Sequence, residues 1–545
     1  MSIRGIRRRL VEHSRVVAYI ITGVFIIGLP LVFVPGRLEP RRADEAAASG
    51  AQVVARVDGI PVTREGVERF FVRSLHQVLP IYAAMNQPFG LDRLWQLRLG
   101  ALEGAILSRL VLREAEARDI EVSGGDIKKA AGEAADQQLS QIKEMAEGAA
   151  SAEVLARIAT RADGRARRSM SEKSFRKWLV ERLLSEGEQE MREGLTAKRL
   201  QQAVTGDVSG TEQELLVSYD VLSFRELVVS RAPSSGTERT DDEAKKRAEE
   251  LLARARGGED FAALVSEESD DPQAAVDGGL QQGLPLSGMP SDWLKALQSL
   301  KPGELAGPLE TPGGYVMVRL ETRERKLPED FEEKKQQYLK DFVTRKQSQA
   351  WSEYQMALRE GAKVEVLGAE MLGYQALRDG DREKALTHLR EAAATADRMS
   401  GPAAAALHYC MATLFAARGE WEEAADAYTG AADATQRGEL PMPGARAEAL
   451  MGMARSYERL GNIEEALVWY AAAGDDSELS GVHSQLLSAY QRLGETERAQ
   501  REQEWLNDYH EAEQERQRAF EEQPSPPDAG GASAPSAPGP APQQP

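Results

Sequence analysis

Cysteine and histidine are scarce in this chain of 545 residues, and its 68 basic residues are outnumbered by 87 acidic ones. Each of these features limits the classes of protein to which the chain can belong. The single cysteine, Cys410, cannot form an intramolecular disulfide bond, and its Ala-rich helical surroundings predict a small buried side chain. The six histidines are scattered, and there is no Walker loop, zinc ligand set or Ser/His/Asp constellation, so we expect neither a metal nor another cofactor. The net charge of −19, with no basic stripe carrying interleaved aromatic residues, argues against a nucleic-acid partner.

One run near the N-terminus, residues 16–34, is uncharged and mostly apolar over nineteen residues, which is long enough to cross a bilayer. Five arginines and one glutamate precede it, and such a cluster is typical of the cytoplasmic side. We therefore expect a cytoplasmic stub at 1–15, a transmembrane anchor at 16–36, a linker at 37–50 and an exported remainder. The alternative is a cleaved signal peptide. Its apolar core is normally shorter, and the small residues Ala46–Ala48 lie well beyond the apolar end.

Residues 220–325 carry the pattern of a small α+β domain. Leu227–Val229 is strand-like, and Thr240 with Glu243 forms a capping box that opens a helix. A short helix around Phe261 and a helix starting near Ser291 follow. A Gly-Gly turn then leads into an alternating strand at residues 315–320.

Within this domain the chain resembles the parvulin family of peptidyl-prolyl cis/trans isomerases. The matching segments are "GGEDFAALVSEESDDPQAA", "DGG", "LKPGELAGPLETPGGY" and, more weakly, "RELVV". The resemblance implies an apolar clamp for the proline ring at Met289 and Trp293, and catalytic roles for Asp271 and Thr311. The family's two histidines fall on Glu226 and Val316, so the resemblance implies weak or absent isomerase activity.

The same residues also allow purely structural interpretations. Met289 and Trp293 are four residues apart, and an apolar pair at this spacing often only packs against a core. Asp271 precedes Pro272, which is a common turn sequence. A carboxylate at Glu226, on the substrate-binding side of the domain, would add like-charge repulsion beside Asp271 where the family has an imidazole.

Residues 51–219 resemble the N-terminal chaperone domain that accompanies parvulins in periplasmic folding factors of the SurA and PpiD type. The passage opens with a strand, a turn at Asp58-Gly59 and a helix that Thr63 is placed to cap. A long amphipathic helix follows around residues 97–112. The Ala-, Gln- and Glu-rich stretch 126–168 is expected to be helical but poorly packed.

After a connecting helix at 326–364, residues 365–512 contain internal repeats. Each repeat has a glycine, an alanine five residues later and, in three repeats, a large apolar or aromatic residue nine residues later. The positions are Gly380, Ala385 and Leu389; Gly419, Ala424 and Tyr428; Gly461, Ala466 and Tyr470; Gly494 and Ala499. The pattern resembles tetratricopeptide repeats, which implies helix pairs and a protein partner. Helical hairpins without a ligand are the alternative. The Pro/Ala-rich residues 523–545 are expected to be disordered.

The sequence thus predicts a multidomain protein with one membrane anchor, a mostly α chaperone domain, an α+β parvulin-like domain and an α-solenoid. The function that fits best is a folding factor in the bacterial inner membrane, facing the periplasm. Its clients would be unfolded or proline-containing polypeptides, held in part by Met289, Trp293 and Glu226. An active isomerase and a repeat-based assembly scaffold remain as alternatives.

Overall fold

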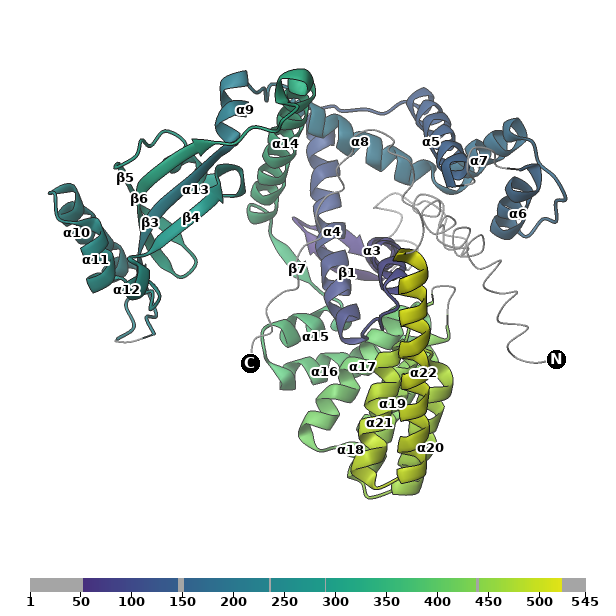
Figure 1. Cartoon of the computed structure of the whole chain (residues 1–545). Helices are drawn as coiled ribbons and strands as arrows, with labels where there is room; N and C mark the ends of the chain where they lie inside the picture. Colours follow the sequence, from purple (N-terminus) through teal and green to yellow (C-terminus); the bar gives the residue numbers. More distant parts are fainter. Residues whose placement is uncertain (1–51, 146–150, 235–236, 290, 438–440, 522–545) are drawn as a thin grey trace. The chain divides into compact units, whose positions relative to one another are not determined.

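The computed structural model describes residues 52–145, 151–234, 237–289, 291–437 and 441–521 (Figure 1). These residues form two compact units. The first unit is built from the chain up to Ala197 and from Leu358 onward, and the second unit is Lys198–Ala357. The second unit is therefore an insertion into the sequence of the first.

The first unit opens with a small antiparallel sheet in the order β2-β1-β7. Strands β1 (Val53–Val57) and β2 (Ile60–Thr63) are joined at Asp58-Gly59, where both residues have positive φ, as the Asp-Gly pair predicts. Strand β7 (Val364–Val366) returns from far along the chain to pair with β1. Thr63 caps the next helix, because its hydroxyl accepts the N–H of Gly66 at 3.2 Å.

Two long helices follow, α3 (Arg64–Ala84) and α4 (Asp92–Ala117). The buried side of α4 includes Leu94, Leu102, Ile106 and Leu110. It also includes Arg98, which the apolar pattern did not predict as a buried position. The helix is thus amphipathic as expected, with an ionic group inside its apolar face.

A separate helical core lies between residues 124 and 186. It is formed by α5 (Gly124–Met145), α6 (Ala152–Asp163) and α7 (Glu172–Glu186). Its buried side chains come from all three helices: Ala131, Ala135, Leu139, Ile142, Leu155, Ala159, Phe175, Leu179 and Leu183. The expectation of poor packing over 126–168 is therefore wrong. The small alanines fit close to the apolar residues of α7, so a stretch of low mean hydropathy still builds a core.

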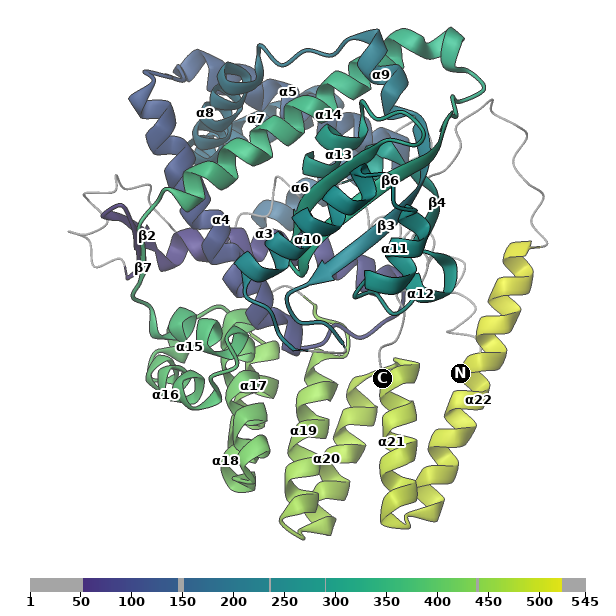
Figure 2. The same ribbon diagram turned by 90° about the vertical axis from the view of Figure 1, so that its left-hand side faces the viewer.

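The repeats fold as helix pairs (Figure 2). The pairs are α15 (Ala369–Arg378) with α16 (Arg382–Ala393), α17 (Gly401–Arg418) with α18 (Trp421–Thr435), α19 (Ala445–Arg459) with α20 (Ile463–Asp476), and α21 (Ser480–Leu493) with α22 (Thr496–Glu521). Each repeat glycine turns its pair with φ between 77° and 82°. Each repeat alanine is buried, which lets the paired helices approach closely.

The N-terminal helices and the repeats share one apolar core. Side chains of β1, α3 and α4 belong to the same cluster of buried residues as those of α15 to α21. Helix α4 packs against α15 and α17. Two segments that the sequence assigns to separate domains, 51–219 and 365–512, thus contribute to one continuous interior.

The second unit is built on a four-stranded antiparallel sheet in the order β4-β3-β6-β5. Its strands are β3 (Asp220–Ser230), β4 (Leu280–Pro285), β5 (Leu305–Thr311) and β6 (Gly314–Arg325). Helices α10 (Asp241–Arg256) and α11 (Phe261–Glu268) cover one face, packing on Leu227, Val229, Tyr315 and Met317. Figure 2 shows both helices alongside β3 and β6. The capping box of α10 is present, with Thr240 N–H donating to Glu243 at 2.8 Å.

The other face of this sheet carries the 3-10 turn η1 (Leu286–Gly288) and α13 (Ser291–Leu297). The remaining helices are α8 (Glu188–Thr205), α9 (Glu212–Ser218), α12 (Ala274–Asp277) and the long α14 (Phe331–Glu360). No helix among the described residues is long and apolar enough to span a bilayer. The expected anchor at 16–36 and the expected disordered tail at 523–545 both lie outside the described residues.

Candidate substrate-binding site

An apolar cluster lies with η1 and α13 on the sheet face that α10 and α11 leave uncovered, and its half-buried members form an apolar surface. Because side chains alternate along a strand, Phe224 of β3 and Val316 and Val318 of β6 point to this face. Half-buried Met289, just after η1, and half-buried Trp293, in α13, pack against them. The rings of Phe224 and Trp293 have centroids 6.2 Å apart and are tilted by 59°. The structure thus brings together the two residues predicted as the proline clamp.

A carboxylate borders this surface. Glu226 lies two residues after Phe224 on the same strand and pairs with Val318 of β6. The side-chain amide of Gln281 donates a hydrogen bond of 3.2 Å to Glu226 Oε1. Burial raises the pKa of Glu226, and the negative charge of Asp271 raises it further, against the opposing effect of the Gln281 hydrogen bond. The like-charge repulsion expected between Glu226 and Asp271 is therefore present.

Asp271 is held in a tight turn just after α11. Its backbone N–H donates to Ser269 Oγ at 3.3 Å, and its carboxylate accepts the N–H of Gln273 at 3.1 Å. The preceding residue, Asp270, has a different role, because it accepts from the N–H of Ser230 at 2.8 Å and pairs with Arg239. Asp270 therefore fixes the loop to β3, and Asp271 is the acidic group of this turn that acts on Glu226.

Thr311 lies at the end of β5, opposite Gly314 of β6. Its hydroxyl donates a hydrogen bond of 3.1 Å to the carbonyl oxygen of Gly314. The side chain thus closes its own hairpin. In this arrangement the Thr311 hydroxyl stabilises the turn that precedes Val316. The negatively charged groups at the site are the carboxylates of Glu226 and Asp271.

Sequence reasoning missed Arg225, which holds the glycine turn next to Glu226. Its guanidinium donates to the carbonyl oxygens of Asp277 at 3.0 Å and Gly278 at 2.9 Å. The next residue, Gly279, accepts the N–H of Glu226 at 2.9 Å and has φ of 65°, and a Cβ there would collide with the carbonyl oxygen of Glu226. The paired glycines of "DGG" were the available signal. They indicated that another backbone segment passes close to these glycines, but they did not show that this segment is β3.

The chemistry open to this site is non-covalent. The barrier to turning an X–Pro bond is loss of amide resonance, about 18–20 kcal/mol, so a catalyst must favour the twisted amide over the planar one. An apolar clamp can hold the ring, whereas two neighbouring carboxylates offer acceptors and no imidazole. Among the described residues, no group of three His, Cys, Asp or Glu side chains could hold a metal ion.

With this geometry in place, comparison with known families gives one match. Residues 228–322 match the rotamase family model, described as a PPIC-type PPIase domain. The parvulin-like unit expected at 220–325 is thereby supported in fold. The match covers β4 and β5 entirely, begins within β3, two residues after Glu226, and ends within β6.

Curated relatives extend the similarity beyond this domain. A chaperone SurA of Polaromonas sp. is 27% identical over 301 residues, which is 54% of this chain and 59% of the relative. The chaperone SurA of Bordetella pertussis is 34% identical over 96 residues, 18% of each chain. That of Methylobacillus flagellatus is 35% identical over 96 residues, 18% of this chain and 22% of the relative. The matched region thus spans less than two thirds of each of these relatives.

Solved structures show more distant likeness. The peptidylprolyl isomerase PrsA from Bacillus anthracis is 17% identical, with 48% of this chain and 95% of that chain covered and a TM-score of 0.22. A SurA-like chaperone structure from Campylobacter jejuni is 12% identical, with 58% of this chain and 99% of that chain covered and a TM-score of 0.21.

Proposed function

We propose that this protein is a membrane-anchored folding factor that faces the periplasm and binds unfolded polypeptides, with a parvulin-type unit of weak or absent isomerase activity. The observation that carries the proposal is the packing of Met289 and Trp293 against one apolar cluster, in which Trp293 contacts Phe224, with Glu226 beside it in place of an imidazole. Such a surface can hold a proline ring or another apolar side chain. At the two positions where the family has histidines, the side chains of Glu226 and Val316 offer no imidazole donor to a twisted amide.

Similarity to chaperones named SurA supports the client class. The 301-residue match to the Polaromonas chaperone is much longer than the PPIC-type domain, so it includes sequence outside that domain. Unfolded secreted or outer-membrane chains are therefore the proposed clients. Binding would use the N-terminal chaperone region together with the clamp of the parvulin-type unit.

Two assays on the full chain test this proposal. The first measures suppression of aggregation of a chemically unfolded protein, and the second measures cis/trans isomerisation of a proline tetrapeptide. We expect clear suppression and an isomerisation rate near background. An isomerisation rate like that of an intact parvulin, abolished by Asp271→Ala, would make the protein an active isomerase. Failure to suppress aggregation would remove the chaperone assignment.

The anchor is a separate part of the proposal, supported by the arginine cluster and the uncharged run at 16–34. A reporter enzyme fused after residue 50 should be exported and should stay with the membrane fraction. Recovery of a mature chain that starts near Ser49 would show a cleaved signal peptide instead.

A further inference from the structure

The loop between α3 and α4 lies against the repeat helices of the same unit. Phe89 and Leu91 in this loop are fully buried. The N–H of Phe89 donates to the carbonyl oxygen of Pro443 at 2.8 Å, just before α19. Pro88 lies so close to Gly444 that a Cβ on this glycine would come within 3.0 Å of Pro88 Cβ. The repeats therefore hold this loop through its backbone as well as its side chains.

A half-buried carboxylate also contacts the same loop. Glu448, in the first turn of α19, accepts the N–H of Leu91 at 2.7 Å through Oε2. Its other oxygen, Oε1, accepts the hydroxyl of Tyr409 of α17 at 2.6 Å. Withdrawing a carboxylate from water is costly unless donors satisfy it, so the loop supplies one of the two donors that compensate Glu448 for its partial burial. Glu448 thus links α17, α19 and the loop.

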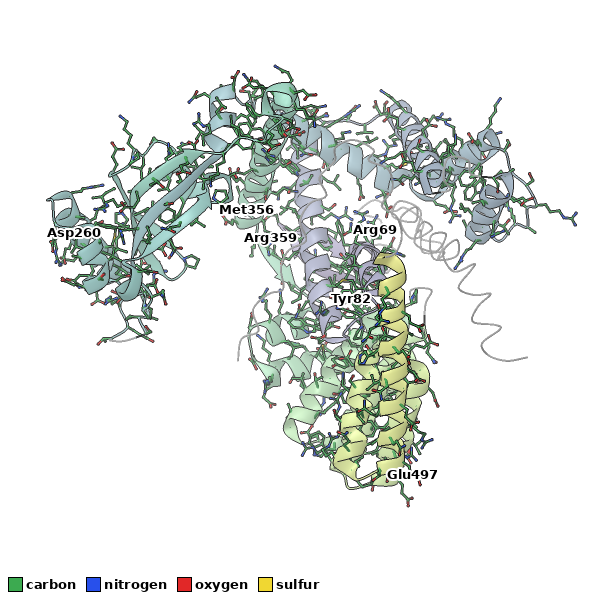
Figure 3. The ribbon with its side chains drawn as sticks, viewed as in Figure 1. Arg69, Tyr82, Asp260, Met356, Arg359 and Glu497 are labelled. Atoms are coloured by element: carbon green, nitrogen blue, oxygen red, sulfur yellow. The ribbon has the colours of Figure 1, made fainter. Side chains whose placement is uncertain are left out.

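Contacts continue from the loop along α4. Tyr82 at the end of α3, labelled in Figure 3, meets Phe89 edge-on with ring centroids 5.2 Å apart. Further along α4, the rings of Trp95 and Tyr374 of α15 lie 6.4 Å apart. The loop and the first half of α4 therefore contact three successive repeat pairs, those that begin with α15, α17 and α19.

We propose that the helical repeats bind a segment of this same chain, residues 87–98, on the surface formed by α15, α17 and the first turn of α19. We name the segment 87–98 the internal ligand. Repeat arrays generally bind their ligands on the surfaces that their stacked helices create. The segment proposed here is a loop that continues into the first part of α4. Here one continuous stretch supplies the apolar side chains that fill the surface and two backbone N–H donors. It also supplies Arg98, which forms an ion pair with Glu370 of α15. The protein partner expected for this surface is thus the chain itself, and a separate partner would need the internal ligand to leave.

Cys410 of α17 offers a direct test. It is the chain's one cysteine and is 4% exposed. Burial raises the pKa of its thiol most, and the negative charges of Asp92 and Glu370 raise that pKa further. Helix α4, whose first part belongs to the internal ligand, packs against α17, and Cys410 lies in the apolar core that they share. Release of that segment should therefore uncover the thiol. The experiment follows the rate at which a maleimide labels Cys410 in the full chain under native conditions.

The first comparison uses Phe89→Ala, with Met85→Ala as its control because Met85 is 59% exposed. We expect slow labelling in the wild type and in Met85→Ala. Labelling should be at least tenfold faster in Phe89→Ala, with far-UV helicity retained. Rapid labelling of the wild-type thiol, at the rate seen in urea, would overturn the proposal.

A second comparison, of two Glu448 variants, tests the proposal even if Phe89→Ala loses helicity. Glu448→Ala removes the acceptor of the Leu91 N–H, whereas Glu448→Gln keeps a carbonyl oxygen there. We expect faster labelling in Glu448→Ala and a rate near wild type in Glu448→Gln. Equal rates in all three proteins would contradict the proposal. A wild-type chain that is dimeric, with a labelling rate that falls as protein concentration rises, would assign the segment to a second copy and also overturn it.

Discussion

Arg98 and Glu370, which are 272 positions apart, form a two-pronged ion pair inside the first unit, with N–O distances of 2.8 and 2.9 Å. Arg98 is fully buried and Glu370 is 2% exposed. Glu68 of α3 accepts a third hydrogen bond from Arg98 at 2.7 Å. Desolvation alone would lower the pKa of Arg98, but the two glutamates outweigh it and the pKa is raised. The pair joins α4 to α15, and so the N-terminal region to the repeats.

The first prediction concerns this pair. Arg98→Met should lower the free energy of unfolding by about 3–5 kcal/mol, because it leaves the Glu370 carboxylate buried without its partner. The double variant Arg98→Met/Glu370→Met should lose clearly less, since the buried Glu370 charge is then absent and only Glu68, whose side chain is 23% exposed, loses its partner. Urea titration followed by far-UV circular dichroism measures both.

A matched control for this prediction is the exposed pair of Arg359 with Glu103, whose side chains are 36% and 46% exposed. Arg359→Met should change the free energy of unfolding by no more than about 1 kcal/mol. A double variant that is as unstable as Arg98→Met would show that lost packing, rather than the stranded charge, dominates.

Local elements of the fold could be predicted because their signals lie within a few residues. The capping box of Thr240 and Glu243, the turn at Asp58-Gly59 and the repeat glycines all act over one turn of chain. The interior role of Arg98 could not be predicted in this way. An arginine in an amphipathic helix normally reaches solvent, and the carboxylate that holds this one comes from α15, beyond the whole second unit.

The sequence predicted some residues of the candidate site and missed others. The resemblance placed Met289 and Trp293 together, and the structure packs both against the apolar cluster that contains Phe224. It also indicated the repulsion between Glu226 and Asp271. The catalytic role expected for Thr311 stays a prediction, because the residue's described contact is with its own hairpin. The roles of Arg225 and Gln281 depend on which strand faces the glycine turn, and a strand's neighbours are not encoded locally.

The second prediction concerns pH. Burial and Asp271 raise the pKa of Glu226 above its usual value of 4.5, so the folded state binds this proton more tightly than the unfolded state. The stabilisation from this group is fully present below about pH 4.5 and is lost as pH rises through the raised pKa. Glu226→Gln should therefore raise the melting temperature at pH 7 more than at pH 4.5. Thermal unfolding of the full chain at both pH values measures this.

Glu329→Gln is the control for the pH prediction, because Glu329 is exposed. It should leave the pH dependence unchanged. If Glu226→Gln raised the melting temperature equally at both pH values, the gain would come from packing or hydrogen bonding, and the titration argument would be wrong.

The third prediction tests the packing of the helix pairs. Ala466 of α20 is fully buried in the shared core, so Ala466→Leu should cost about 1–3 kcal/mol through overpacking. Val468 on the same helix is 56% exposed, and Val468→Leu should be neutral. Urea unfolding of the full chain compares the two variants. Unchanged stability in Ala466→Leu would contradict the close approach of α19 and α20 at this alanine.

The fourth prediction concerns the clamp and the missing imidazoles. Trp293→Ala removes the ring that packs on Phe224, so it should weaken binding of proline-containing peptides by about tenfold, or ~1.4 kcal/mol. Met356→Ala is a suitable control because Met356 is an apolar residue of the same unit that is 55% exposed. Fluorescence anisotropy with a labelled peptide measures both affinities.

Glu226→His tests the other half of this argument. We expect little change in peptide affinity, because the clamp is untouched, and an isomerisation rate that stays near background. Val318 and Val316 line the same face and offer no hydrogen-bond donor, so one restored imidazole at position 226 still lacks the second. Glu226→His/Val316→His restores both positions, and it should increase the isomerisation rate above that of either single variant. A single Glu226→His variant with the rate of an intact parvulin would show that position 316 is dispensable and that the carboxylate alone had suppressed catalysis.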